Sequence, residues 1–257
     1  MFLSGHCDSV QATFLVELGR WGEAEALLTR AKADFEAIMP PPSWHPDIAL
    51  ADLRIRQGRF SEAEALLLGK DQALQALAPA ARLHLARGDY ELARATARRG
   101  LRVIKGARLR AVDLLTVLID AELARGDLGA AAEACAELTE RTGDVEVPAL
   151  QARAAAARAR VQAATGQLDE AIATLEAAVD RLDARQLPWL HATLLLDLSR
   201  LPDRAGDGSG ATVDANAAAA ALATLDVVVA PADVAILERA RHQPARERTA
   251  RLTRYGK

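Results

Sequence analysis

Hydrophobic residues in this chain form short stripes, and each stripe follows a glycine. After Gly19, and again after Gly166, apolar side chains recur at intervals of three and four residues. Because an α-helix has 3.6 residues per turn, this spacing places them on one helical face. A second helical pattern precedes each glycine, so the predicted unit is a helix, a tight turn and another helix. Glycine suits such a turn because it adopts positive φ at little cost.

The turn has a recurring sequence: a glycine, a large apolar residue two positions later and an alanine five positions later. Five copies begin at Gly19, Gly58, Gly88, Gly126 and Gly166. A worn sixth copy begins at Gly206, with Gly208 at the apolar position. Successive copies lie 39, 30, 38, 40 and 40 residues apart, and such a repeat predicts a solenoid. Asp89, Asp127 and Asp207 directly follow three of these glycines, where a carboxylate can cap the next helix.

The segments between and after the repeats have patterns of their own. Residues 40–46 are rich in proline and are predicted to connect the first two units. Residues 225–230 are mostly β-branched and apolar, which favours an extended backbone before a last helix over residues 231–241. We therefore predict one helical repeat domain over residues 1–241. Residues 242–257 are predicted to be a basic tail or a linker to a further domain.

Composition narrows the class of protein without naming a reaction. Apolar residues make up 51% of the 257 residues but aromatic residues only 4%, so alanine and leucine must fill the core. The net charge of -3 gives no overall field that favours nucleic acid or a membrane surface. No apolar run is long enough to span a bilayer. The two cysteines lack a C-x-x-C partner, so a disulfide framework is not expected and a reducing, cytoplasmic location is.

The sequence carries little that favours catalysis. The glycine-rich residues 206–210 lack the lysine and hydroxyl residue of a phosphate-binding loop and are predicted to be a linker. Only His6 and Cys7 adjoin each other, and neighbouring residues on a helix point in different directions. Paired carboxylates near the turns are Glu23, Glu25, Glu62 and Glu64. Their place in the first helical turn favours a structural role beside the helix dipole over acid–base chemistry. We expect no catalytic residue, no metal and no cofactor.

One basic stripe leaves two alternatives open. Arg94, Arg98 and Arg102 recur every four residues and so share a helix face. Such a stripe could contact phosphates of a nucleic acid. A solvated helix face is favoured, because no aromatic or base-reading motif accompanies the arginines.

The repeat resembles the tetratricopeptide motif, in which a small residue lies seven positions before the turn glycine. These positions hold Ala12, Ala51, Ala81, Ile119, Ala159 and Ser199, and the second-helix alanine of the family matches Ala24, Ala63, Ala93, Ala131, Ala171 and Ala211. The early tryptophan and mid-helix tyrosine of the family are missing, and most intervals exceed its ~34 residues. The resemblance covers roughly residues 4–225. It implies an all-α fold, a right-handed superhelical solenoid of about six helix pairs.

Two segments are also similar to the helical arm of LuxR-type, maltose-regulator-like bacterial transcription regulators. They are residues 53–67 and 81–89. In that family the arm senses ligands or partner proteins, which implies a non-catalytic sensor or interaction module here. The chain shows neither a Walker-type loop nor a helix-turn-helix, so nucleic acid would be reached only through a missing domain. A stand-alone scaffold for protein assembly is the alternative function.

The tetratricopeptide resemblance also implies that the first helices line a concave groove. Counting back from each glycine gives its candidate binding residues: His6, Thr13, Glu17, His45, Asp52, Arg56, Arg82, Asp120 and Arg160. Such grooves hold peptides or helices through mixed polar and apolar contacts. The expected partner is therefore a protein or peptide, with a small-molecule effector as a further candidate and no membrane. The alternative is that these side chains only solvate the inner face.

Overall fold

The computed structural model describes residues 2–38, 45–104, 110–201 and 209–242. These residues form thirteen α-helices and one short 3-10 turn, joined by loops, and they contain no β-strand. The helices are α1 (Phe2–Glu17), α2 (Trp21–Ile38), α3 (His45–Arg56), α4 (Phe60–Leu67), α5 (Leu77–Ala86), α6 (Tyr90–Val103), α7 (Arg110–Ala124), α8 (Leu128–Thr142), α9 (Pro148–Ala164), α10 (Leu168–Arg181), α11 (Pro188–Arg200), α12 (Ser209–Leu222) and α13 (Pro231–His242). The 3-10 turn, Leu74–Ala76, precedes α5.

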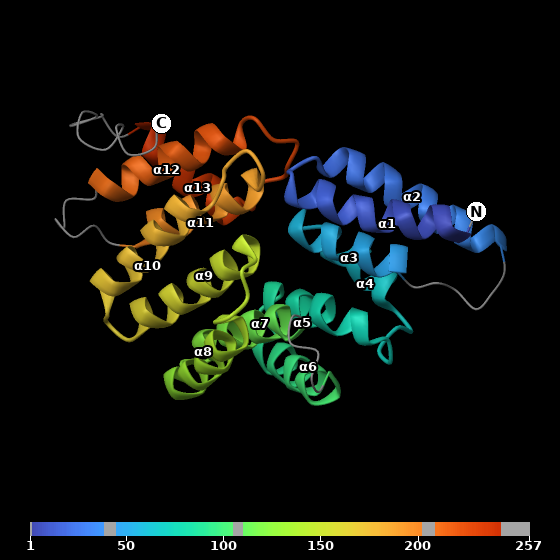
Figure 1. The fold of residues 1–257 in the computed structure, drawn as a ribbon, viewed down its shortest axis with the longest axis horizontal. Helices are drawn as coiled ribbons and strands as arrows, with labels where there is room; N and C mark the ends of the chain where they lie inside the picture. Colours follow the sequence, from blue (N-terminus) through green and yellow to red (C-terminus); the bar gives the residue numbers. More distant parts are fainter. Residues whose placement is uncertain (1, 39–44, 105–109, 202–208, 243–257) are drawn as a thin grey trace.

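Consecutive helices pack as pairs, from α1 with α2 to α11 with α12, and α13 packs on α12. The pairs follow one another along an arc, as Figure 1 shows. Each pair also contacts the next, so apolar clusters follow one another along the solenoid, within and between the helix pairs. The all-α solenoid of about six helix pairs is thus confirmed.

The turn glycines and the small residues around them have the roles that their spacing predicts. Five turn glycines have φ between 70° and 84°, which favours glycine over any other residue. The alanine five positions after each of these glycines is fully buried. The residue seven positions before is also buried in all five repeats, including the larger Ile119. The worn sixth glycine lies outside the described residues.

Of the caps predicted at helix starts, one is confirmed and one is wrong. Asp127 caps α8, because its carboxylate accepts a hydrogen bond from the Ala130 N–H at 3.0 Å. Asp89 precedes α6 but its side chain makes no such bond, so the predicted cap is wrong there. The first-turn Glu91 of α6 bonds Arg125 instead. Asp207 lies outside the described residues, and α3 already begins at His45, within the predicted connector.

The segment before α13 returns to the first helix pair (Figure 1). The Trp21 N–H donates to the backbone oxygen of Asp226 at 3.1 Å, and the Gly22 N–H donates to its carboxylate at 2.8 Å. Asp226 therefore caps the start of α2 from 204 residues away in sequence. A Cβ on Gly22 would lie 2.6 Å from that carboxylate, so only glycine permits this approach. Trp21 also meets Trp189 of α11 edge to face, with ring centroids 4.8 Å apart.

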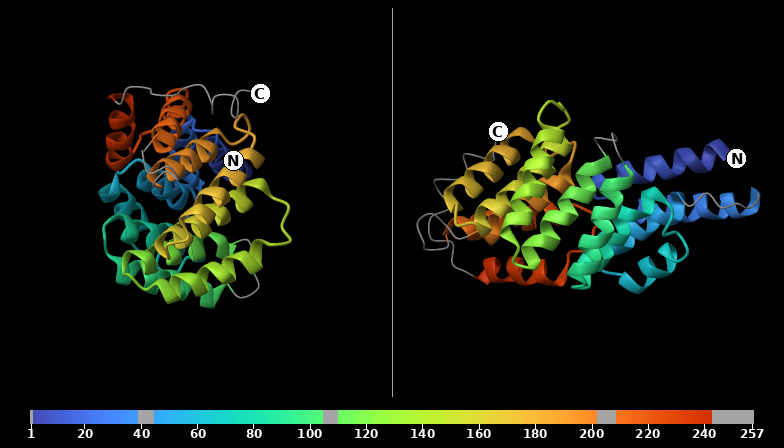
Figure 2. Two further views of the ribbon diagram at one scale, coloured as in Figure 1. Left: turned by 90° about the vertical axis from the view of Figure 1, so that its left-hand side faces the viewer. Right: turned by 90° about the horizontal axis from the view of Figure 1, so that it is seen from below.

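The first pair differs from the others in what covers it. The start of α1 and the end of α2 project from the rest of the molecule in the right-hand view of Figure 2. Phe14, five positions before its glycine, is 66% exposed. The equivalent residues of the next two repeats, Leu53 and Leu83, are 1% and 4% exposed. A preceding helix pair covers those residues, and no described helix covers Phe14.

Candidate functional site: the inner charged face

Charged side chains from the first helices of successive repeats meet on the inner side of the arc. The position six residues before the turn glycine holds Asp52 on α3, Arg82 on α5, Asp120 on α7 and Arg160 on α9. The sign alternates from repeat to repeat, and equivalent positions of neighbouring repeats are adjacent. Arg82 consequently pairs with Asp52, and Arg160 Nε lies 2.8 Å from Asp120. The repeat register thus forms a ladder of ion pairs.

Six alternately charged side chains close into a ring on this face. Arg56 contacts Glu17 at 3.4 Å and Asp52 at 3.3 Å. Arg153 contacts Glu17 at 2.6 Å and Asp113 at 3.4 Å. Arg82, paired with Asp52, lies 3.9 Å from Asp113 and completes the ring. The members come from α1, α3, α5, α7 and α9: Glu17, Arg56, Asp52, Arg82, Asp113 and Arg153. We call them the inner ring.

The ladder continues from α9 towards the last helices. Arg160 reaches Asp197 on α11 at 3.2 Å, in addition to Asp120. Arg200 of α11 pairs with both Asp197 and Asp233 of α13. Arg200 lies six positions before Gly206, which is the register of Arg160 in the previous repeat. The worn sixth repeat therefore keeps the inner charge although its turn sequence has decayed.

The side chains of the inner ring are partly exposed to solvent, and burial and neighbouring charges shift the pKa values of some of them. Its side chains are between 17% and 46% exposed. Burial would raise the pKa of Glu17, but Arg56 and Arg153 together hold that pKa below its ordinary value. Burial lowers the pKa of Arg82, and it raises the pKa of the neighbouring Asp120 despite Arg160. Within the described residues no hydrogen bond reaches Glu17 Oε2, although that atom is buried.

The structure brings together six of the nine residues that the sequence proposed for a groove. The six are Glu17, Asp52, Arg56, Arg82, Asp120 and Arg160. Thr13 is exposed and donates its hydroxyl to the Ser9 carbonyl, and His45 is exposed at the start of α3. The His6 side chain lies outside what the structure describes. Whether these residues bind a partner stays a prediction.

Four residues of this face escaped the sequence analysis: Asp113, Arg153, Asp197 and Arg200. A signal for three of them was present: Arg200 lies six positions before Gly206, in the register of Arg160, and the other two follow a second register. His6 and His45 lie thirteen positions before their glycines, and the same position holds Asp113 and Arg153 in the fourth and fifth repeats. Following that register along the whole chain would have found both.

The basic stripe on α6 is not simply a solvated face. Arg94 and Arg98 turn towards α7 and contact the Glu122 carboxylate at 3.0 and 2.9 Å. Glu122 is fully buried and also pairs with Arg125 at 2.5 Å. The expectation of a solvated stripe is therefore wrong for these two arginines, whereas Arg102 is exposed. Their charge is thus balanced in part within the fold, by Glu122 and Glu91.

The carboxylates near the first turns also bridge repeats. Glu25 receives two hydrogen bonds from the buried Arg54, which hold its pKa at about 2. Glu64 pairs with Arg87 at 2.9 Å across the next junction. Glu25 lies six positions after its glycine and Arg54 four before the next, the same register as Arg94 and Glu122 with the charges exchanged. These glutamates thus join neighbouring repeats, beyond the helix-dipole role expected of them.

Other chemistry is sparse in the part of the chain that the structure describes. No group of three or more metal-ligating side chains is gathered there. Cys7 is exposed and Cys135 buried, and both are free thiols. None of the described helices is both long and apolar enough to cross a membrane.

Comparison with known proteins bears on four helix pairs. A tetratricopeptide-repeat family model matches residues 5–30, 44–68, 74–99 and 152–177. These segments correspond to α1–α2, α3–α4, α5–α6 and α9–α10. The pair α7–α8, whose first helix carries Ile119 at the small position, lies outside the matches. No curated protein matches the chain significantly.

Proposed function

We propose that this tetratricopeptide-repeat helical protein is a non-catalytic interaction module whose inner ring binds a charged segment of a partner protein. Tetratricopeptide repeats generally bind proteins or peptides, which they hold along the first helices of successive repeats. The observation that carries the proposal is the inner ring itself. It gathers six formal charges from five first helices on one partly exposed face.

The ion pairs of Asp113 are the ones in the inner ring that can be exchanged at low cost, because Asp113 is 46% exposed. Salt bridges of exposed side chains contribute about 0–1 kcal/mol each, because water competes for both partners. A carboxylate of a partner can therefore replace Asp113 within the ring with little loss of stability. Glu17 Oε2 adds a buried acceptor that no described donor uses. A partner N–H that displaced a flanking guanidinium group could reach it and would remove the penalty of an unsatisfied buried atom.

The balance of charge indicates the kind of segment that fits. The inner ring contains three carboxylates and three guanidinium groups, so it favours neither a purely acidic nor a purely basic partner. Because the signs alternate along the ladder, a segment with alternating charges would find complementary groups in sequence. Wrong partners would be disfavoured where like charges meet.

We further propose that the module serves as the sensor or interaction arm of a bacterial transcription regulator. This rests on the resemblance of residues 53–67 and 81–89 to such arms. A stand-alone scaffold is equally compatible with the fold. The coding sequence on either side of these 257 residues distinguishes the two. An adjoining ATPase module or helix-turn-helix supports the arm, and their absence from both sides supports the scaffold.

The binding proposal can be tested with an array of mixed-charge, acidic and basic peptides. The variant Asp52→Asn/Arg56→Gln/Arg82→Gln removes half of the inner ring. We expect mixed-charge peptides to bind the wild-type chain and to bind this variant at least tenfold more weakly. Replacing the exposed outer pair Arg20 and Glu23 by glutamine is the matched control and should leave affinity unchanged. Equal binding to the wild-type chain and the triple variant would refute the inner ring as the binding site.

A further inference from the structure

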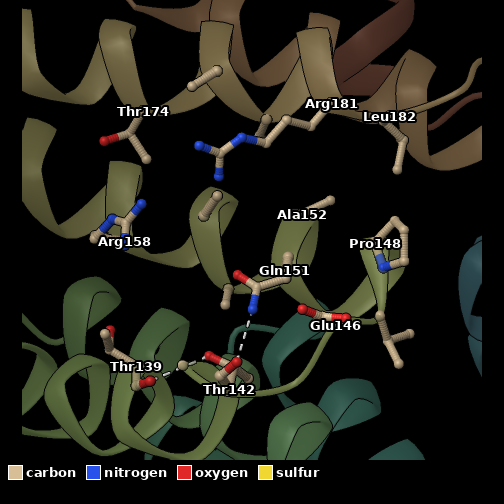
Figure 3. Close-up of a pocket in the computed structure, with 16 residues that line it drawn as sticks. Thr139, Thr142, Glu146, Pro148, Gln151, Ala152, Arg158, Thr174, Arg181 and Leu182 are labelled. Carbon is tan, nitrogen blue, oxygen red and sulfur yellow. Dashed lines mark hydrogen bonds between the residues drawn. The ribbon is translucent and has the colours of Figure 1, made fainter.

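A cavity of about 360 Å³ lies at the junction of the fourth and fifth helix pairs, away from the inner ring. The end of α8, the loop after it, the first half of α9 and the end of α10 line it, and it opens to solvent (Figure 3). Its volume falls within the range of pockets that hold small organic ligands. Gln151 of α9 holds the loop after α8 in place, because its Nε2 donates to the carbonyls of Thr142 and Val145 at 2.8 and 2.9 Å.

Two arginines give this cavity a positive end. Arg158 of α9 and Arg181 of α10 both line it, and Figure 3 shows both side chains reaching into it. Neither forms an ion pair with another residue that the structure describes, in contrast to the arginines of the inner ring. Each side chain is exposed to solvent, so it can pair with a ligand without first breaking an ion pair within the protein. Two guanidinium groups beside one cavity suit a carboxylate or a phosphate, which accept paired hydrogen bonds.

Most of the remaining wall is apolar, but the exposed Glu146 of the loop, Gln151 and three threonines also line the cavity. Alanines of α9 and α10 form part of its wall, and larger apolar side chains close it near the loop. They are Ala152, Ala155, Ala178, Val147, Pro148 and Leu182. Hydroxyl groups add little donor capacity, because Thr139, Thr142 and Thr174 already donate to atoms of the protein. A ligand therefore meets two cationic donors from α9 and α10, an apolar wall, and one carboxylate, that of Glu146 in the loop, which an anionic head group would avoid.

We propose that this cavity binds a small organic anion, a carboxylate or phosphate monoester carried on a short apolar body. The anion would lie between Arg158 and Arg181, and the apolar body against the alanine wall. Such a ligand would bridge α8, α9 and α10 and fix the angle between the fourth and fifth pairs. α9 also carries Arg153 and Arg160 on its inner side, so the ligand would act on a helix that holds the inner ring. The proposal is independent of peptide binding at the inner ring, so either can fail alone.

The test uses the full chain and three probes of equal length: hexanoate, hexyl phosphate and the neutral hexanol. Titration is followed through the methyl signals of Ala152, Ala155 and Ala178 in a ¹H–¹³C spectrum. We expect at least one of the two anions to shift these signals and to bind at least tenfold more tightly than hexanol. The better anion identifies whether carboxylate or phosphate is the preferred head group.

The matched variants decide whether the arginines are responsible. Arg158→Gln/Arg181→Gln should weaken anion binding at least tenfold and leave the spectrum otherwise folded. Arg30→Gln/Arg185→Gln removes two exposed arginines outside the cavity and should change affinity less than twofold. Equal binding of hexanol, unchanged binding to the cavity variant, or shifts outside the cavity would overturn the proposal. So would binding of an acidic peptide at the cavity when neither small anion binds.

Discussion

Replacing Glu122 by glutamine tests whether the buried carboxylate holds the junction of the third and fourth repeats. Glu122 has no exposed surface and accepts contacts from Arg94, Arg98 and Arg125. Glutamine keeps the shape of the side chain but removes its charge. Three guanidinium groups would then face a neutral amide whose N–H₂ cannot accept their hydrogen bonds.

The magnitude follows from the exposure of the partners. Removing one member of a buried ion pair destabilises a protein by about 3–5 kcal/mol. The three arginines are 25–41% exposed, so water recovers part of the loss. Arg94 and Arg125 also keep their contacts with Glu91. We therefore expect Glu122→Gln to lower the free energy of unfolding by about 2–3 kcal/mol.

Urea unfolding followed by circular dichroism measures this loss, and hydrogen exchange localises it to α6 and α7. With a urea dependence of about 3 kcal/mol per molar, the midpoint should fall by roughly 0.7–1 M. Glu91→Gln is the matched control, because Glu91 contacts two of the same arginines but is 68% exposed. It should cost less than about 1 kcal/mol. Equal losses for the two variants would refute the argument that burial makes Glu122 dominant.

Three further predictions concern other junctions. Gly22→Ala should destabilise the chain by about 1–3 kcal/mol in thermal unfolding, because its Cβ meets a carboxylate at 2.6 Å. Gly129→Ala, with its nearest contact at 3.7 Å, should instead stabilise it by about 0.5–1 kcal/mol. The pKa of Glu25 is about 2 in the fold against 4.5 ordinarily, so its stabilisation is complete above pH 4.5 and is lost towards pH 2. Between pH 4.5 and pH 2, the free energy of unfolding of Glu25→Gln should therefore fall by about 1–2 kcal/mol less than that of the wild-type chain. Trp189→Ala removes the ring that packs against Trp21 and should raise hydrogen exchange in α1 and α2. Tyr90→Ala removes a partly exposed ring from the third repeat and should not raise it.

The glycine spacing was enough to predict the helix pairs because each repeat is governed by local rules. A glycine at positive φ ends one helix, and small residues at fixed offsets let two helices pack closely. Ala12 and Ala24 around Gly19 show this, since both are fully buried. These constraints act within about twenty residues, so a pattern in the sequence expresses them directly.

The inner ring was predictable only in part. Offsets from the glycine placed Asp52 and Arg82 of the ring on one face, together with Asp120 and Arg160 of the adjoining ladder, and the structure shows them there. Which residue each one pairs with depends on the curvature of the arc. Arg153 contacts Glu17 across 136 residues because the fifth repeat bends back to the first. Positions within one repeat give no information about a contact between repeats so far apart in sequence.

The ion pairs of Glu122 with Arg94 and Arg98 were missed for a different reason. Glu122 lies on a helix whose sequence is mostly apolar, and only its neighbours on another helix reveal why a carboxylate is buried there. In sequence, Arg94 and Arg98 therefore resembled an unpartnered stripe. A charge on an otherwise apolar helix, such as Glu122, predicts a partner of opposite charge on the adjoining helix, and here Arg94 and Arg98 of α6 are those partners.

Closure of the arc changes what kind of solenoid this is. In an open array each repeat contacts only its neighbours, so the terminal repeats fray first. Here Arg153 ties the fifth pair to the first, and Asp226 caps α2 from beyond the sixth. Loss of the first pair would thus also remove a contact of the fifth pair and one of the segment before α13. Because Glu17 belongs both to this closure and to the inner ring, a partner that competes for Glu17 also acts on the contact that holds the arc shut. Binding at the inner ring and opening of the arc are for that reason expected to be coupled.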